Sequence, residues 1–379
     1  MSRRVLFVLM LVCALAVLTP RAWAQRPPET DPPTGVITQD IVMSWDRSAM
    51  PGDIEIWAPK TLIAHERTGG EGYGELFLTC ASETDSLTGK CATEDTHATT
   101  RGVHSQVPLR LRERRGGMPA EITFKGALYR IDAVNWCVSD YWHREMYTLY
   151  SSYAQTCLGE LVVGTGASLL LEASELRRLT AGHWVGKLEL DLRKPPSQFL
   201  AKFVFNFDFT VTDYDAISIY FPAFDTIAPL VNMDLRYDPI KQMVGGRKQL
   251  EMCLYDGLGS QSEFLGVTVR DSGPRPPPGS DFAVWHRDGG SDDRQRLDYH
   301  VSLNYGGRDI RMRHGVEELL HGIESAELRL VMLPGISQPV YCVPTPLTLL
   351  TPPTPVASKR PGLYEGELTV ELRVPTAKP

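Results

Sequence analysis

Apolar and polar residues alternate along many short segments of this chain. The segment KLELDL (187–192) places three leucines on one face of a predicted strand, and FVFNFDFTV (203–211) does the same with four phenylalanines. The same period of two recurs in ISIYF (217–221), FLGVTVR (264–270), DYHVSL (298–303) and AELRLVML (326–333). Turns rich in Gly, Pro, Asp and Ser separate these segments. Short alternating strands with turn signals between them predict an all-β protein built of β-sandwiches.

Helix signals are scarce. EASELRRL (172–179) and HGVEELLH (314–321) are the two segments for which a turn or two of helix is predicted. The last regular segment, GLYEGELTVELRVP (362–375), again has a period of two, with Leu368, Val370, Leu372 and Val374 on one face. We therefore expect a half-buried strand there, and a strand so close to the end of the sequence raises the question of what pairs with its outer edge.

Two domains are predicted, with a boundary between two strong strand signals. The residues Thr212-Asp213-Tyr214-Asp215 lie between FVFNFDFTV and ISIYF. We expect domains at 25–212 and 216–379, joined by a linker at 213–215 that is too short to allow much freedom. Proline-rich stretches at 26–34, 272–281 and 344–362 predict irregular connections within these units.

The first residues predict export from the cytoplasm. Arg3 and Arg4 precede the apolar run VLFVLMLVCALAVL, and Ala22-Trp23-Ala24 supplies small residues for cleavage. A secretory signal at 1–24 explains this pattern better than an uncleaved anchor, because the apolar run is short and a cleavage site follows it. Its removal takes away three arginines, so the net charge changes from −7 to about −10. That balance disfavours a general binder of nucleic acid or of anionic membranes.

Six cysteines remain after the signal, because Cys13 lies within it. An even number in an exported chain predicts disulfides. Proximity in the sequence favours three pairs: Cys80–Cys91, Cys137–Cys157 and Cys253–Cys342. A zinc site is the competing interpretation, but no CxxC motif occurs. We expect no metal and no cofactor.

Motifs of catalysis are weak. DGLGSQS (256–262) lacks the final glycine of a GxSxG elbow, and the histidines of HGVEELLH lack the HExxH spacing of zinc proteases. HRDGGSDD (286–293) lacks the spacing of a calcium loop. We expect a protein that is not an enzyme.

Six segments together carry a resemblance to a known family. They are LFLTCASETDSLTGKCAT (76–93), RERRGGMPAEITFKG (112–126), ASLLLEASELRRLTAGHWVGKLELDLRK (167–194), LEMCLYDGLGS (250–260), VMLPGISQPVYCVP (331–344) and GLYEGELTV (362–370). In this order, and with all six cysteines in place, the chain resembles the CfaE/CblD-type minor subunits of class 5 chaperone–usher fimbriae. These are tip adhesins or pilus initiators of Gram-negative bacteria.

The resemblance implies two immunoglobulin-like sandwiches in tandem, an adhesin domain followed by an incomplete pilin domain. A periplasmic pilus chaperone would cover the open edge of the pilin domain, and an outer-membrane usher would receive the complex. The N-terminal extension of the major pilin subunit would then replace the chaperone as a donor strand. The groove for that strand would include Leu363 and the apolar face at Leu368, Val370, Leu372 and Val374. An ordinary edge strand, protected by its charged outer residues, is the alternative.

The resemblance also implies a receptor-binding cluster of arginines on the adhesin domain. The family's basic pair falls near Lys194 and Pro195, with Arg193 just before, and its third position falls on Glu75. Arg193 and Lys194 are therefore candidates for binding a carboxylate or sulfate of a glycan. A solvated strand end is the alternative.

A second basic cluster follows from the residues alone and consists of Arg110, Arg112, Arg114 and Arg115. Because the leucines beside them face inward, Arg110 and Arg112 share the outer face of one predicted strand, and the other two enter a Gly-Gly turn. The cluster is a candidate site for an acidic glycan or a host surface, and a charged edge that resists aggregation is the alternative.

The predicted function is a minor subunit at the fimbrial tip, exported through the periplasm to the cell surface, that initiates assembly and adheres to a receptor. A purely structural initiator without a receptor is the alternative. A secreted carbohydrate-active enzyme built on β-sandwiches is a weaker hypothesis, because the opposed carboxylates it needs are not evident.

Overall fold

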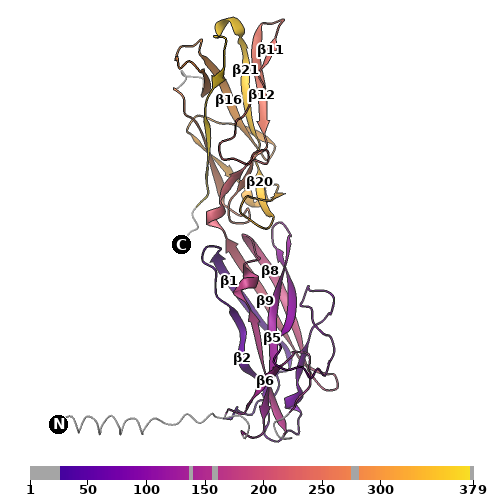
Figure 1. Ribbon diagram of the computed structural model, residues 1–379. Coiled ribbons are helices and arrows are strands. Elements are labelled where there is room, and N and C mark those ends of the chain that lie inside the picture. Colours follow the sequence, from indigo (N-terminus) through magenta and orange to yellow (C-terminus); the bar gives the residue numbers. More distant parts are fainter. Residues whose placement is uncertain (1–25, 136–139, 156–160, 275–280, 376–379) are drawn as a thin grey trace, which may run out of the picture.

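A computed structural model describes residues 26–135, 140–155, 161–274 and 281–375. The strands form two bodies that stand end to end (Figure 1). We call the body containing β1 to β9 the first domain and the body containing β10 to β23 the second domain. The predicted signal at 1–24 and the predicted pair Cys137–Cys157 lie outside the described residues. No helix in the described ranges is long and apolar enough to cross a membrane.

The first domain is a network of nine strands around one apolar core. Their order is β1-β9-β8-β4-β5-β7-β2, with β3 paired to β8 and β6 paired to β5. The strands are β1 (Gly35–Asp46), β2 (Ile54–His65), β3 (Phe77–Thr79), β4 (Ser105–Glu113), β5 (Pro119–Asp132), β6 (Trp142–Tyr147), β7 (Val162–Leu171), β8 (Gly182–Lys194) and β9 (Gln198–Thr212). Two short helices, η1 (Tyr73–Glu75) and α2 (Ala173–Leu176), interrupt them.

The alternation of β8 and β9 places their apolar residues in this core, as predicted. The strands are antiparallel, with Leu188 opposite Phe205 and Leu190 opposite Phe203. The three leucines of KLELDL are fully buried, and the four phenylalanines of FVFNFDFTV are at most 9% exposed. Because the period of a strand is two, the polar residues between them all face outward, which builds the surface described below.

The strand β1 runs parallel to β9 along its whole length. The register begins with Gly35 beside Ala201 and ends with Asp46 beside Thr212. Because β9 also pairs with β8, both of its edges are satisfied. The first domain therefore closes the outer edge of its last strand with a strand from its own start.

The second domain is divided among three sheets. Their orders are β10-β13-β20-β19, then β11-β12-β21-β16-β15-β22 with β17 beside β16, and β18-β14-β23. The strands are β10 (Ser218–Tyr220), β11 (Arg236–Asp238), β12 (Met243–Leu250), β13 (Cys253–Tyr255), β14 (Phe264–Asp271), β15 (Phe282–His286), β16 (Arg296–Tyr305), β17 (Arg308–Arg311), β18 (Glu317–His321), β19 (Arg329–Val331), β20 (Val340–Pro344), β21 (Leu347–Pro355), β22 (Tyr364–Glu365) and β23 (Leu368–Arg373). Its short helices are η2 (Tyr214–Ala216), η3 (Ile323–Ser325) and η4 (Val356–Ser358).

One predicted helix is wrong. HGVEELLH (314–321) contains the strand β18, which pairs antiparallel with β14. The spacing of Val316, Leu319 and Leu320 fits a helical face, but only Leu320 enters the core, whereas Leu319 is 44% exposed. The edge of β14 supplies hydrogen bonds that a single helical turn cannot match, so tertiary context decides the conformation. The other predicted helix is confirmed as α2.

Two predicted disulfides are confirmed within the described residues. Cys80 and Cys91 are joined with their Cα atoms 5.2 Å apart, and Cys253 and Cys342 with theirs 5.7 Å apart. The second bond links the neighbouring strands β13 and β20. Each therefore stabilises one domain, the first by closing a surface loop and the second by joining distant parts of the chain.

The turn after β4 docks the first domain onto the second. The guanidinium of Arg115 donates to the carbonyl oxygens of Ser260 and Ile323, both at 2.6 Å, and of Ala326 at 2.7 Å. The hydroxyl of Tyr341 donates to the carbonyl of Gly116 at 3.1 Å. A Cβ atom at Gly116 would lie 2.0 Å from the Tyr341 ring, so only glycine permits this approach. Arg115 is thus an interdomain contact.

Replacing Arg115 with alanine is expected to weaken this contact. Three carbonyl groups lose a charged donor, and we expect a loss of about 2 kcal/mol, because hydrogen bonds to charged groups contribute ~1.5–3 kcal/mol each and this side chain is only partly buried. Scanning calorimetry of the full chain should show the unfolding of the two domains become less coupled. Arg114→Ala, which removes an exposed neighbour, is the matched control. Identical scans for the two variants would contradict the interdomain role.

Candidate functional site

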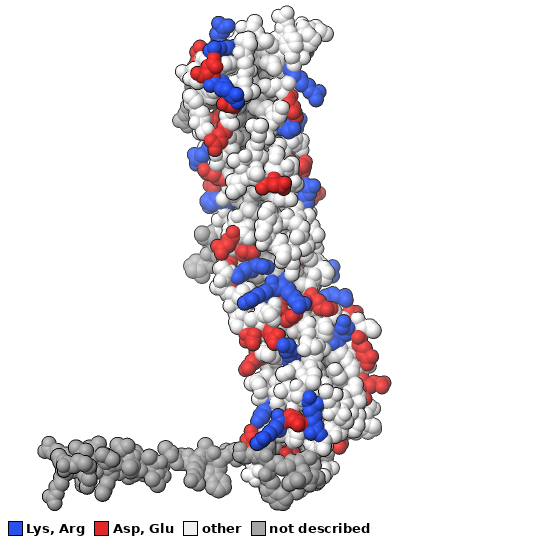
Figure 2. Space-filling model, viewed as in Figure 1, with Lys and Arg blue, Asp and Glu red and all other residues white. Residues whose placement is uncertain are grey.

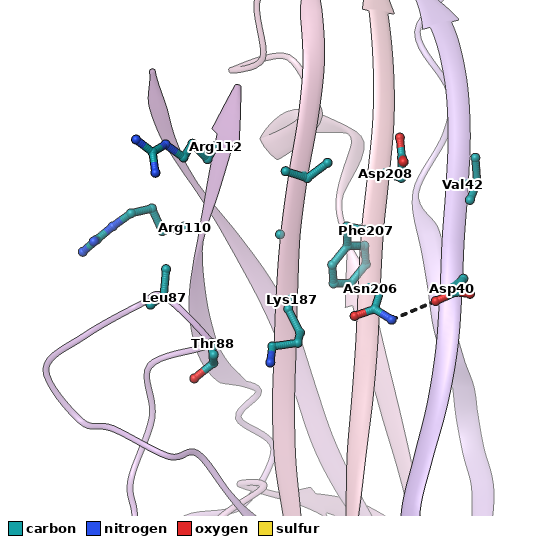
Figure 3. A pocket seen from close by; sticks show the side chains of 12 residues that line it. Asp40, Val42, Leu87, Thr88, Arg110, Arg112, Lys187, Asn206, Phe207 and Asp208 are labelled. Atoms are coloured by element: carbon teal, nitrogen blue, oxygen red, sulfur yellow. Dashed lines mark hydrogen bonds between the residues drawn. The ribbon is translucent and has the colours of Figure 1, made fainter. Parts of the chain in front are cut away.

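The outward face of β1, β9, β8 and β4 carries a groove of about 710 Å³. The register of these strands aligns their polar residues in rows across the sheet. One row runs Asp40, Asn206, Lys187, and the next runs Val42, Asp208, Val185, Arg112. Arg110 and the loop residues Leu87 and Thr88 complete the wall beside β4 (Figure 3).

One wall of the groove is basic. Arg110 and Arg112 share the outward face of β4 and line the groove, whereas Arg114 follows the end of β4 and lies outside the lining; all three are exposed. Arg110 forms an ion pair with Asp85 at 3.2 Å. Within the part of the chain that the structure describes, Arg112 and Arg114 have no carboxylate partner. Arg112 therefore carries an uncompensated positive charge at the edge of the groove (Figure 3), where its guanidinium lies beside the turn at Gly117.

The disulfide loop 80–91 holds this wall in place. β4 and β8 pair over only two residues and then diverge. The loop fills the gap between them: the backbone N–H of Arg110 donates to the carbonyl of Ser86 at 2.8 Å, and that of Glu189 donates to the carbonyl of Thr88 at 2.9 Å. The loop is thus bonded to both strands, and the disulfide shortens it, so this wall is preorganised.

The opposite wall carries carboxylate and amide groups. The Asn206 amide donates to the Asp40 carboxylate at 2.8 Å, an interaction drawn in Figure 3. His183 Nε2 lies 2.5 Å from Asp208 Oδ1. In the middle of the groove, Lys187 forms an ion pair with Glu189 at 2.6 Å. These contacts fix the acceptor groups of the wall and leave further lone pairs of the two aspartates for a ligand.

The remaining sequence candidates lie elsewhere. Arg193 is held by its own surroundings, since it donates to Asp191 at 3.0 Å and to the Thr79 hydroxyl at 3.1 Å. Lys194 ends β8 with its Cε near Gly72. Arg115, as shown above, contacts the second domain. The structure thus places two of the six candidate cations, Arg110 and Arg112, in the groove.

Lys187, Asp40 and Asp208 were not identified from the sequence. Lys187 and Asp208 are polar positions in the predicted alternating strands, so their outward direction was predictable. Asp40 lies beside Gln39, which is also polar and exposed, so alternation did not indicate its direction. What sequence alone does not reveal is that β1 pairs with β9 and that β8 lies between β9 and β4. Their convergence depends on strand order, which is a long-range property of the fold.

The edge strand β23 is the second candidate region. It pairs with β14 on one side and ends its sheet. Its apolar residues Leu368, Val370 and Leu372, together with Val374, are half-buried against the core of the second domain. Leu363 does not share this environment, because it is 53% exposed. The predicted strand is divided in two: β22 belongs to the sheet of β15, and only β23 joins β14.

Charges of both signs are interspersed along the visible face of the molecule (Figure 2). The described residues contain no cluster of three or more His, Cys, Asp or Glu suited to a metal ion. The two features with a distinct chemistry are therefore the groove of the first domain and the free edge of the second.

Comparison with known proteins gives the two domains a family. The family model for the first domain of CfaE, a fimbrial subunit of CFA/I, matches residues 20–214, and the model for the second domain of CfaE matches residues 217–376. The CFA/I fimbrial protein CfaE of Escherichia coli is 27% identical over 305 residues, which cover 79% of this chain and 80% of that protein.

Solved structures share the fold. The crystal structure of CfaE, the adhesive subunit of CFA/I fimbria of enterotoxigenic E. coli, matches with a TM-score of 0.68 at 23% identity, covering 93% of this chain and 95% of that chain. A structure from a chaperone–tip adhesin complex that acts in the biogenesis of CFA/I fimbriae matches with a TM-score of 0.67 at 23% identity. The match covers 93% of this chain and 99% of that chain. The two family models together cover most of the sequence, and the chain belongs to the CfaE family of CFA/I fimbrial proteins, whose members are non-enzymatic subunits of cell-surface fimbriae.

Proposed function

We propose that this chain stands at the tip of a fimbria, where its second domain accepts the donor strand that begins assembly and its first domain attaches to a surface receptor. The domains would be 25–212 and 216–379 with the linker at 213–215, after removal of a signal at 1–24. Relatives described as an adhesive subunit and as part of a chaperone–tip adhesin complex support this role.

The free edge of β23 is the observation that carries the proposal. Its outer edge has no strand partner among the described residues, and its apolar face lies half-buried on the core. Backbone N–H and C=O groups along such an edge are a template for another strand. Most folded domains protect an apolar edge of this kind, so its exposure here indicates that a partner completes it.

The segment 221–235 supports the same conclusion from another part of the core. Phe221, Phe224 and Met233 pack against the core that β23 lines, yet none of the fifteen positions belongs to a strand. Ile227 and Leu230 are almost fully exposed, at 106% and 99%. A segment with apolar residues and no ladder of hydrogen bonds is expected beside a missing strand.

Strand addition would satisfy both features. An extended segment along β23 would form main-chain hydrogen bonds with its free edge, and its alternate side chains would cover the half-buried residues. A periplasmic chaperone would supply this strand first and deliver the chain to an outer-membrane usher. The N-terminal extension of the major fimbrial subunit would then replace it.

Fusing such a donor strand to the end of the full chain is expected to raise the unfolding temperature of the second domain. Burying three or four half-exposed apolar side chains contributes about 4 kcal/mol, which corresponds to a rise of roughly 10 °C for a domain of this size. Circular dichroism melting of the fused and unfused chains measures it.

The matched control is the same fusion with its alternating apolar residues changed to serine, which keeps the backbone but removes the burial. We expect this control to melt close to the unfused chain. A donor fusion that melts together with its serine control would show that β23 does not accept a strand.

A further inference from the structure

We propose that the groove of the first domain binds a glycan residue that carries a single carboxylate. The site rests on the proposed attachment role of this domain and names the chemistry of its ligand. It is formed by Arg110 and Arg112 on one side, Asp40 and Asp208 on the other, and Lys187 between them, as Figure 3 shows.

Arg112 is the anchor for the carboxylate. It is exposed, it lines the groove, and it has no carboxylate partner in the described ranges. A guanidinium binds a carboxylate through two parallel N–H donors, which gives orientation as well as attraction. Arg110 precedes Arg112 by two residues and lies on the same face of β4, but Asp85 already compensates its charge. The basic wall therefore offers one strong anion position.

This charge pattern favours a monoanion over a polyanion. Lys187 shares the carboxylate of Glu189 with Lys202, and Arg110 pairs with Asp85, so both charges are at least partly compensated. Asp40 and Asp208 on the facing wall would repel a second negative group. A sulfated chain with many charges would meet repulsion from these aspartates, whereas a sugar with one carboxylate at Arg112 would not.

The acidic wall suits the hydroxyl groups of a sugar. Carboxylate oxygens accept hydrogen bonds from hydroxyl donors, and the two aspartates are already oriented, Asp40 by the Asn206 amide and Asp208 by His183. Binding therefore needs little ordering of these side chains. A carboxylate at one wall and hydroxyls at the other match the two ends of a sugar acid.

Two exposed apolar side chains complete the site. Val42 is 73% exposed on β1, and Leu87 is 59% exposed at the tip of the disulfide loop. They lie on opposite walls of the groove. Apolar groups so placed contact the C–H faces of a sugar ring, which contain no hydrogen-bonding atoms.

Saturation-transfer difference NMR with the full chain tests the site. The probes are 3′-sialyllactose, a disaccharide ending in glucuronate, neutral lactose and heparin. We expect the two sugars with one carboxylate to bind, and lactose to bind at least ten-fold more weakly. Whichever of the two binds more tightly identifies the kind of sugar acid, sialic acid or glucuronate, that the groove prefers. Arg112→Ala should weaken binding of the acidic sugar by about ten-fold or more, because it removes a charge-assisted pair.

Arg177→Ala is the matched control, since it removes an exposed arginine beside α2, outside the groove. Melting curves verify that both variants are folded. Equal binding of lactose and the acidic sugars would overturn the proposal, as would tighter binding of heparin or unchanged binding by Arg112→Ala.

Adhesion of beads coated with the full chain to epithelial cells tests the attachment role on its own. Together with the sugar-binding experiment, it distinguishes failure of the site from failure of the proposed function. Adhesion that persists in Arg112→Ala would place attachment elsewhere and overturn the site as the receptor contact, while the adhesive role stands. Binding of acidic sugars that depends on Arg112, without adhesion to any cell, would support the site and contradict the attachment role.

Discussion

Replacing Arg130 with alanine is expected to unfold the first domain. This arginine lies on β5 and is completely buried. It donates to the carbonyl oxygens of Leu76 at 2.8 Å, Ser151 at 2.7 Å and Tyr153 at 3.3 Å, and to the Thr165 hydroxyl at 2.7 Å. It thus joins β5 and β7 to the segments that precede β3 and follow β6, all through a single side chain.

The expected loss is large because three carbonyl groups would lose their donor and the Thr165 hydroxyl would keep only its bond to the Tyr73 carbonyl. Each unsatisfied group costs ~1–3 kcal/mol, and the missing side chain leaves a cavity as well. The sum, roughly 5 kcal/mol or more, is comparable with the whole stability of a typical domain. Burial lowers the pKa of Arg130 to about 10, so the group is still charged at neutral pH and donates all of these bonds.

Urea unfolding followed by circular dichroism, together with the yield of folded protein, measures this effect. Arg130→Lys keeps a positive donor but cannot reach all four acceptors, so an intermediate stability is expected. Arg144→Ala removes an exposed arginine on β6 and should leave stability unchanged. If Arg130→Ala unfolded at the same urea concentration as Arg144→Ala, the buried hydrogen bonds would not hold the domain together.

Removing the disulfide between Cys253 and Cys342 is expected to have the second-largest effect. The two residues are 89 positions apart in the sequence. In the chain-entropy account, a cross-link of this span restricts the unfolded state by about 4.6 kcal/mol. The double change to alanine should therefore lower the free energy of unfolding of the second domain by a similar amount.

The bond between Cys80 and Cys91 provides the internal comparison, because it spans only 11 positions. The same account gives about 2.8 kcal/mol for it. Changing each pair to alanine removes the same atoms, so the difference reports loop length. Equal losses from the two double variants would mean that local packing, rather than chain entropy, determines what each disulfide contributes.

The sequence predicted features that depend on near neighbours. The buried faces of β8 and β9, and the apolar face of β23, follow from a period of two in the residues themselves. The segment at 314–321 shows the limit, because its apolar spacing fits a helix and only the free edge of β14 makes it a strand. Arg130 shows the same limit: a charge within an apolar strand becomes intelligible only when four distant acceptors surround it.

Only the basic side of the groove could be predicted, for the same reason. Arg110 and Arg112 share a face of one strand, and alternation alone indicated that. Their relation to Asp40 and Asp208 requires the parallel pairing of β1 with β9 and the insertion of the disulfide loop between β4 and β8. Arg115 follows Arg112 by three residues, yet the turn after β4 directs it to the other domain.

The parallel pairing of β1 with β9 also bears on how many fibres a cell can build. That strand is already bonded within its own domain, so it is not available to a neighbouring subunit, whereas β23 offers one open edge. In a fibre joined by exchanged strands, a subunit that only accepts a strand has a valence of one. Under the proposed function, each copy would start one fibre, so the supply of this chain would determine the number of fibres and the supply of the major subunit their length.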